Sequence, residues 1–166
     1  MASNESAPRP RNVRSPLPPT LTDSTGFLLG WVSSHASEAF ASALTEVGLT
    51  AHQLGVMTLL IGGPQKQARL SEQLEVFQPV MVTLVNELEA AGLVRRAPHP
   101  SDRRAVEVHL EPAGAERLAR ADAAMAVATE RIFGRLPDAD RDTLHRILLQ
   151  MAHQLDSNPT PPRQES

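Results

Sequence analysis

The stretch that decides the fold runs from residue 78 to residue 96 and reads QPVMVTLVNELEAAGLVRR. Its apolar residues recur every three or four positions, at Met81, Leu84, Val85 and Leu88. This spacing is typical of one apolar stripe on a helix. Pro79 suits the first turn, where its missing N–H costs no hydrogen bond. Gly92 suits the helix end, where a left-handed residue is favoured.

The flanks of this helix predict a helix-turn-helix with a β-hairpin. A short helix is expected before it, from about Gln67 to Leu74. After it, LVRR at 93–96 and the turn-rich PHPSD at 98–102 lead to Val106, Val108 and Leu110, which alternate with polar residues as in a half-buried strand. This order predicts a winged helix-turn-helix, whose second helix enters a DNA major groove. The hairpin tip would reach the flanking backbone or the minor groove.

Composition excludes several classes of protein. The 166 residues favour one domain, and no apolar run is long enough to span a membrane. With no cysteine, disulfides, thiolate metal sites and thiol switches are excluded. The amino-terminal region has arginines but no apolar secretory core, so a cytoplasmic protein is expected. A net charge of −3 still permits specific DNA binding, which depends on local charge.

The domain boundaries follow from proline-rich ends. Residues 1–20 are expected to be a disordered arm, and 157–166 a second disordered tail. The domain spans 21–156, with the winged helix-turn-helix at about 50–111. The arm carries Arg9, Arg11 and Arg14, so it is either a solvated tail or a basic arm that touches DNA.

The helices around the core carry their own start signals. Asp23, Ser24 or Thr25 can cap the first long helix, and Thr50 can cap the next. The helix after Thr50 is expected to turn its apolar residues inward, at Leu54, Met57, Leu60 and Ile61. Pro112 opens a long helix that is expected to run to about Leu136.

The first long helix, at about 24–47, and the last two helices, which begin at Pro112 and at Pro137-Asp138 and together span about 112–155, would leave apolar seams uncovered in a monomer. A homodimer is therefore expected. Its contact residues are predicted to be Leu28, Val32, Met125, Ile132, Leu144, Leu148 and Met151.

Three segments together resemble the MarR family of transcriptional regulators. They are LTAHQLGVM at 49–57, LEAAGLV at 88–94 and SDRRA at 101–105, and the resemblance covers about residues 24–155. It implies a mainly α fold with a β-hairpin wing and dimerisation helices. It also implies a homodimer on a pseudo-palindromic operator, released by a small aromatic or phenolic ligand. Pro79 and Val80 stand where the family often has small polar residues, and His99 where it often has an acidic one.

The predicted DNA contacts lie on two elements. On the recognition helix, Gln78 can pair with adenine, Val80 can touch a thymine methyl group, and Thr83 and Asn86 can reach bases or backbone. An ordinary polar helix face is the alternative.

In the wing, Arg103 is expected in the minor groove. The resemblance implies that Arg104 pairs with Asp102 to shape the tip. Arg95 and Arg96 are predicted to meet phosphates, at most one of them being structural. Gln67, Arg69 and the neighbouring Lys66 are further phosphate candidates. A solvated charged ribbon is the alternative.

The sequence offers candidate residues for an effector cleft and none for a metal site or an active site. Trp31, His35 and His52 could line an effector cleft, since aromatic rings stack on aromatic ligands. Their alternatives are core packing and plain surface. The six histidines form no metal-binding pattern, so neither metal nor cofactor is expected. No nucleophile elbow or phosphate loop occurs, so an enzyme is not expected.

The leading interpretation is a dimeric, ligand-responsive repressor that binds double-stranded DNA. The alternative is a winged-helix module that binds another protein.

Overall fold

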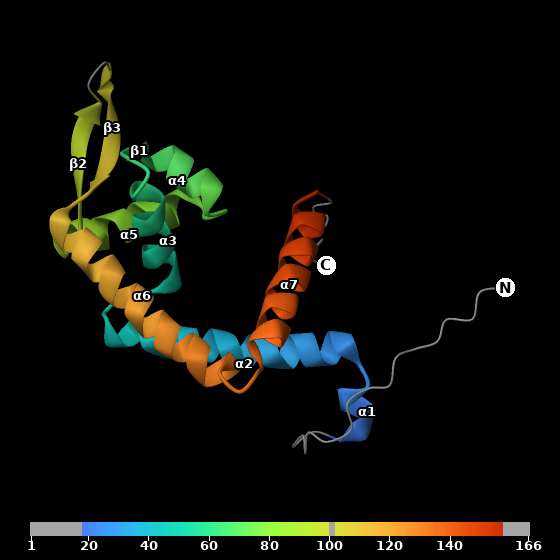
Figure 1. The fold of residues 1–166 in the computed structure, drawn as a ribbon. Coiled ribbons are helices and arrows are strands. Elements are labelled where there is room, and N and C mark those ends of the chain that lie inside the picture. The colour runs from blue at the N-terminus through green and yellow to red at the C-terminus, as the bar shows by residue number, and fades with distance from the viewer. Residues whose placement is uncertain (1–17, 100–101, 158–166) are drawn as a thin grey trace. The chain divides into compact units, whose positions relative to one another are not determined.

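The computed structural model describes residues 18–99 and 102–157, which form the elements drawn in Figure 1. In chain order these are α1 (Pro19–Thr22), α2 (Thr25–Glu46), α3 (Ala51–Leu60), β1 (Gln65–Lys66), α4 (Gln67–Gln73), α5 (Gln78–Ala90), β2 (Val94–His99), β3 (Asp102–Leu110), α6 (Pro112–Phe133) and α7 (Asp138–Ser157). Within the described residues the chain divides into two compact units, one ending at Glu38 and the other beginning at Ala39. The predicted mainly α fold with a β-hairpin wing is confirmed.

Capping groups set the ends of the helices as the sequence predicts. Ser24 caps α2, because its hydroxyl accepts a hydrogen bond from the Phe27 N–H at 3.3 Å. Thr50 and Gln53 form a reciprocal capping box at the start of α3. At the end of α5, Gly92 adopts a φ of +70°, and the Leu93 N–H donates to the Leu88 carbonyl at 2.9 Å. This is the left-handed helix end that favours glycine.

One hydrophobic core joins α3, α4, α5, the wing and part of α6. Its most fully buried side chains are Met57, Leu70, Met81, Leu88, Val56, Val85, Val94 and Val108. Leu118 and Ala121 of α6 and Leu44 of α2 belong to the same cluster. The core therefore fixes the inner face of α5 and the base of the wing on a common support.

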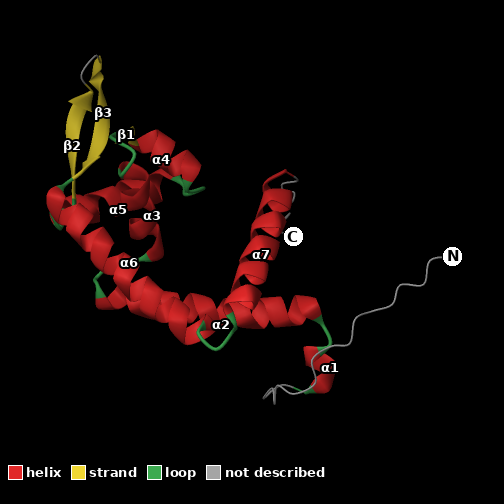
Figure 2. Ribbon diagram, viewed as in Figure 1, coloured by secondary structure: helices red, strands yellow, loops and turns green. Residues whose placement is uncertain are grey.

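The sheet has three antiparallel strands in the order β1-β3-β2, which Figure 2 shows in yellow. In the hairpin, Val94 pairs with Leu110 and Arg95 with His109, and the register shifts between Pro98 and His99. The third strand, β1, pairs Gln65 with Val108. The sequence does not predict it, because a two-residue strand has no periodicity to detect.

The structure corrects three local expectations. Ile61 is 67% exposed rather than inward, because α3 ends one residue before it. Val106 is half exposed, since it lies nearer the hairpin tip than the buried Val108. The helix that begins at Pro112 ends at Phe133 rather than near Leu136, and Gly134 caps it. The amino-terminal arm through residue 17 and the tail from residue 158 lie outside the described residues.

Candidate nucleic-acid interface

Helix α5 is held by the core on one side and is exposed on the other. Met81, Leu84, Val85 and Leu88 are buried, as the sequence predicts. The turn from α4 is fixed by Ser71, whose hydroxyl donates to the Val76 carbonyl while the Val76 N–H donates to the Ser71 carbonyl at 3.0 Å. The helix is therefore a rigid support for the residues on its outer face.

The outer face of α5 carries the four residues predicted to contact DNA. Gln78, Val80, Thr83 and Asn86 are all exposed. The structure adds Phe77, which directly precedes the helix and is 84% exposed. Sequence reasoning missed Phe77. A large apolar residue outside the inward stripe, next to the helix start, is the signal that could have found it.

Arg96 ties the wing to α5. Its main-chain N–H donates to Glu89 Oε1 at 2.7 Å, and its Nη1 lies 2.5 Å from Glu89 Oε2. Its Nη2 also donates to the Gln67 side-chain oxygen at 3.3 Å. These bonds to Arg96 hold the pKa of Glu89 below its ordinary value of 4.5.

Arg95 is also paired within the chain. Its Nε lies 2.7 Å from Glu111 Oε1, and its side chain is 53% exposed. The sequence assigns both Arg95 and Arg96 to phosphates, with at most one structural. The structure gives each of them a carboxylate partner, and Arg96 also donates to Gln67. Phosphate contact by Arg95 and Arg96 stays a prediction.

The remaining predicted cations lie at two places. Arg69 is exposed on α4, and Lys66 is exposed just before it. Gln67 contacts Arg96, as described above. Residues 102–110 form β3, but the side chains of Asp102, Arg103 and Arg104 lie outside the described residues. Their roles at the wing tip stay predictions.

The three predicted effector residues form one local pair and one isolated residue. The rings of Trp31 and His35 lie 4.1 Å apart between centroids, and His35 Nδ1 lies 2.8 Å from the Trp31 carbonyl oxygen. Trp31 is half-buried, and His35 and His52 are exposed. Neither of the two cavities described next is lined by these residues.

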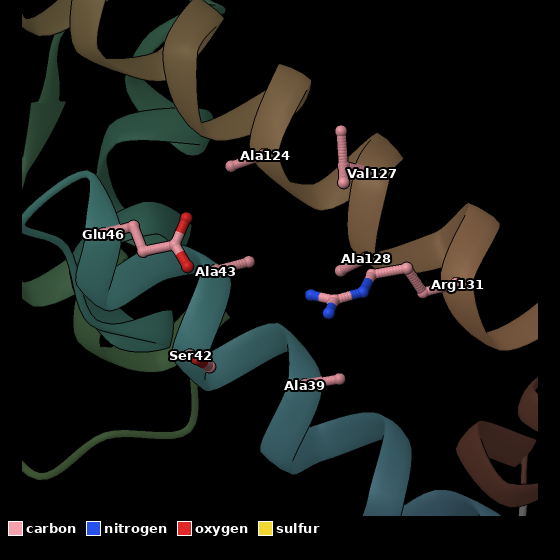
Figure 3. A pocket seen from close by; sticks show the side chains of 8 residues that line it. All are labelled: Ala39, Ser42, Ala43, Glu46, Ala124, Val127, Ala128 and Arg131. Atoms are coloured by element: carbon pink, nitrogen blue, oxygen red, sulfur yellow. The ribbon is translucent and has the colours of Figure 1, made fainter.

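The larger of these two cavities has about 250 Å³ and lies between the second half of α2 and α6. It is lined by Ala39, Ser42, Ala43, Glu46, Ala124, Val127, Ala128 and Arg131. Figure 3 shows Glu46 on one helix and Arg131 on the other, with Ala43 and Ala128 near the line that joins them. The small side chains leave space between the helices, and the two charged groups give it a polar edge. The other cavity has about 230 Å³ and is lined by Thr129, Phe133, Arg141, Leu144, His145 and Leu148.

The predicted dimer residues differ in how far one chain covers them. Met125 is half-buried and packs against the intrachain core. Leu28, Ile132 and Leu144 are half-buried, and Val32, Leu148 and Met151 are exposed. In α7, no described side chain is buried. Its exposed apolar residues also include Ile147, Leu149 and Leu155.

Within residues 18–99 and 102–157, no group of three or more acidic, histidine or cysteine side chains is placed to hold a metal ion. In the same part of the chain, no helix combines the length and the apolar character that crossing a membrane requires.

Comparisons with known proteins agree on one family. A sequence model of the MarR family matches residues 47–105. A protein from Thauera aromatica, described as a transcriptional regulatory protein for the hcr operon, is 32% identical over 81% of this chain and 82% of its own. The repressor CouR bound to a 23-mer DNA duplex is 30% identical, with a TM-score of 0.70 over 83% of this chain and 99% of its own. CouR from Rhodococcus jostii RHA1 bound to p-coumaroyl-CoA is 29% identical, with a TM-score of 0.65 over 86% of this chain and 98% of its own.

Proposed function

The chain belongs to the MarR family of transcriptional regulators, and we propose that it is a homodimeric repressor which a small aromatic or phenolic ligand releases from a pseudo-palindromic operator. The observation that carries this proposal is the exposed face of α5. Gln78, Val80, Thr83 and Asn86 lie on it, while the opposite face is locked in the core. An α-helix presented in this way fits the width of a B-DNA major groove.

Positive charge beside α5 supports DNA as the partner. Lys66 and Arg69 are exposed at the start of α4, the first helix of the helix-turn-helix, which crosses the DNA backbone in such motifs. Arg103 at the wing would enter the flanking minor groove, where the negative potential is strongest. Phosphate contacts position the protein, and contacts from α5 to base edges supply the sequence preference.

Dimerisation is supported by the uncovered apolar side chains of α7. Most of the stability of a helix in a protein comes from packing of its apolar face. Leu148, Met151 and Leu155 are each more than a third exposed in the single chain. A second copy would cover them, and the symmetry would place two α5 helices on one duplex. Adjacent major grooves on one side of DNA are about 34 Å apart.

Ligand release is supported by CouR, whose solved structures include one with DNA and one with p-coumaroyl-CoA. In the present chain, the cavity between α2 and α6 is the candidate site. An engineered cavity of roughly 150 Å³ holds benzene, so 250 Å³ suffices for one aromatic ring. Arg131 would pair with a phenolate or carboxylate. A ligand that favours a dimer with a different α5 spacing must lower DNA affinity by the same coupling.

The test is a titration of the full chain against the DNA upstream of its own gene. Excess competitor DNA and several salt concentrations separate specific from non-specific binding. We expect tight binding that resists competitor and weakens steeply with salt. The same assay with added p-coumaroyl-CoA, and with Arg131→Gln as the matched variant, tests release. If the protein binds neither this DNA nor any genomic fragment more tightly than it binds the competitor DNA, the alternative of a protein-binding winged helix is favoured.

A further inference from the structure

Resting on the proposed function, we propose that α5 selects A·T-rich half-sites by apolar contact with the methyl groups of thymine. The residues involved form the reading face, defined as Phe77, Gln78, Val80, Val82, Thr83 and Asn86. The partner is thus one chemical class of DNA, a major groove lined with thymine methyl groups and adenine edges.

Phe77 is the first observation that carries this inference. It occupies the position that caps α5, yet it makes no side-chain capping bond and is 84% exposed. Serine, threonine, aspartate and asparagine are favoured at such positions. A phenylalanine there contributes neither a cap nor core packing, and locally unfavourable choices of this kind are expected at functional sites. Val80 lies one helical turn further on and is 48% exposed.

The absence of basic residues from α5 is the second observation. The helix sequence QPVMVTLVNELEA contains neither arginine nor lysine. The commonest specific contact in protein–DNA complexes is arginine or lysine to guanine, so α5 cannot supply it. Both carboxylates of α5 are held by intrachain partners. Glu87 accepts from the Gln53 amide at 2.8 Å, and Glu89 accepts from Arg96.

Thr83 is the third observation. Its hydroxyl donates to the Pro79 carbonyl at 3.2 Å, so its hydrogen is not available to a base. The side chain can then offer a methyl group and acceptor lone pairs. Val82 adds a further exposed apolar surface, at 42%. Among the reading-face residues, the amides of Gln78 and Asn86 are the remaining hydrogen-bond donors, and these side chains pair bidentately with adenine.

The experiment begins with selection of duplexes from a random library by the full-length protein. We expect the enriched half-sites to carry A·T pairs at the positions that α5 faces. The selected duplex is then resynthesised with uracil for thymine at those positions, which removes only the 5-methyl group. Wild-type affinity should fall by about fourfold for each methyl group that α5 touches and the substitution removes, the equivalent of one buried methylene.

The same two duplexes are then titrated with Phe77→Ala. This variant should bind the thymine duplex more weakly than wild type, and it should lose part of the discrimination between thymine and uracil. Ile61→Ala is the matched control, since it shortens an exposed apolar residue just after α3 and should keep the full discrimination. Circular dichroism and dimer mass verify that each variant is folded.

The outcomes separate this inference from the proposed function. Enriched half-sites with G·C pairs facing α5, or wild-type affinity unchanged by uracil, would overturn the methyl readout and leave specific DNA binding intact. If Phe77→Ala discriminates between thymine and uracil as well as wild type does, Phe77 takes no part in the methyl readout. A library in which no sequence is enriched would overturn specific DNA binding itself, and this inference with it.

Discussion

Arg96 joins the wing to the recognition helix through Glu89, whose two carboxylate oxygens accept from the main-chain N–H of Arg96 at 2.7 Å and from its guanidinium at 2.5 Å. Seven residues separate the two, and Gly92 turns the chain between them. The contact fixes the start of β2 against the last turn of α5. It therefore couples the two elements that are proposed to contact DNA.

The Glu89–Arg96 contact should make stability depend on pH. The lowered pKa of Glu89 means that the folded state binds fewer protons than the unfolded chain. The contribution is complete above the unfolded value near 4.5 and is lost as the pH falls through the lower folded value. Because the Glu89 side chain is 39% exposed, we expect the contact to contribute only about 0.5 kcal/mol to the free energy of unfolding.

Urea unfolding of Glu89→Gln over a pH series measures this effect. The variant should be less stable than wild type at neutral pH, and the difference should shrink as the pH falls below 4.5. Glu87→Gln is the matched control for the loss of one charge on the same helix. A difference that is constant with pH would show that the contact is not ionic.

Glu75 lies in the turn of the helix-turn-helix and adopts a φ of +52°. A left-handed backbone is unfavourable for a residue with a Cβ and favourable for glycine. Glu75→Gly should therefore raise the free energy of unfolding by about 1 kcal/mol. Glu72→Gly, inside α4, should lower it by about 1 kcal/mol. Thermal unfolding that shows both variants to be destabilised would contradict the assigned turn.

Gly114 in the first turn of α6 lies against the base of the wing. A Cβ there would collide with the Leu93 carbonyl oxygen and approach Leu110 Cδ1 to 2.7 Å. Gly114→Ala should therefore lower the free energy of unfolding by about 1–3 kcal/mol, although alanine favours a helix. Gly30→Ala in α2 is the comparison, because a Cβ there would meet nothing within 4 Å. It should raise the free energy of unfolding by up to about 1 kcal/mol. Equal gains in urea unfolding would refute the close packing at Gly114.

The proposed dimer can be tested on α7. Leu148→Glu places a charge among exposed apolar side chains that a second copy would cover. We expect the dissociation constant of the dimer to rise at least tenfold, the effect of about 1.4 kcal/mol. Gln150→Glu is the matched control, because it adds a charge to the same helix at an exposed polar position. Sedimentation of both variants decides the matter, and an unchanged dimer in Leu148→Glu would place the interface elsewhere.

The sequence predicted those features that local signals encode. Apolar periodicity located α5 and its buried residues, Thr50 announced the start of α3, and Gly92 marked the end of α5. Each depends on residues within a few positions of one another. Their free energies are local, so the pattern in the chain is sufficient.

Features that depend on distant residues were not predictable in this way. The pairing of Gln65 with Val108, and of Gln67 with Arg96, requires the tertiary fold. The ion pairs of Arg95 and Arg96 were missed for the same reason, since a charged side chain in a basic run gives no sign of its partner. The cavity between α2 and α6 likewise arises from alanines on helices far apart in sequence.

Two copies of the chain are proposed to read one duplex through their α5 helices, and hydroxyl-radical footprinting tests this arrangement most directly. On the duplex selected by the full-length protein, we expect two protected segments on one side of the DNA. Their centres should be about 34 Å apart, or about ten base pairs. Gln78→Ala should weaken both segments together, since symmetry places the same residue in each. A single protected segment, or two with no relation to the helical repeat, would contradict the claim.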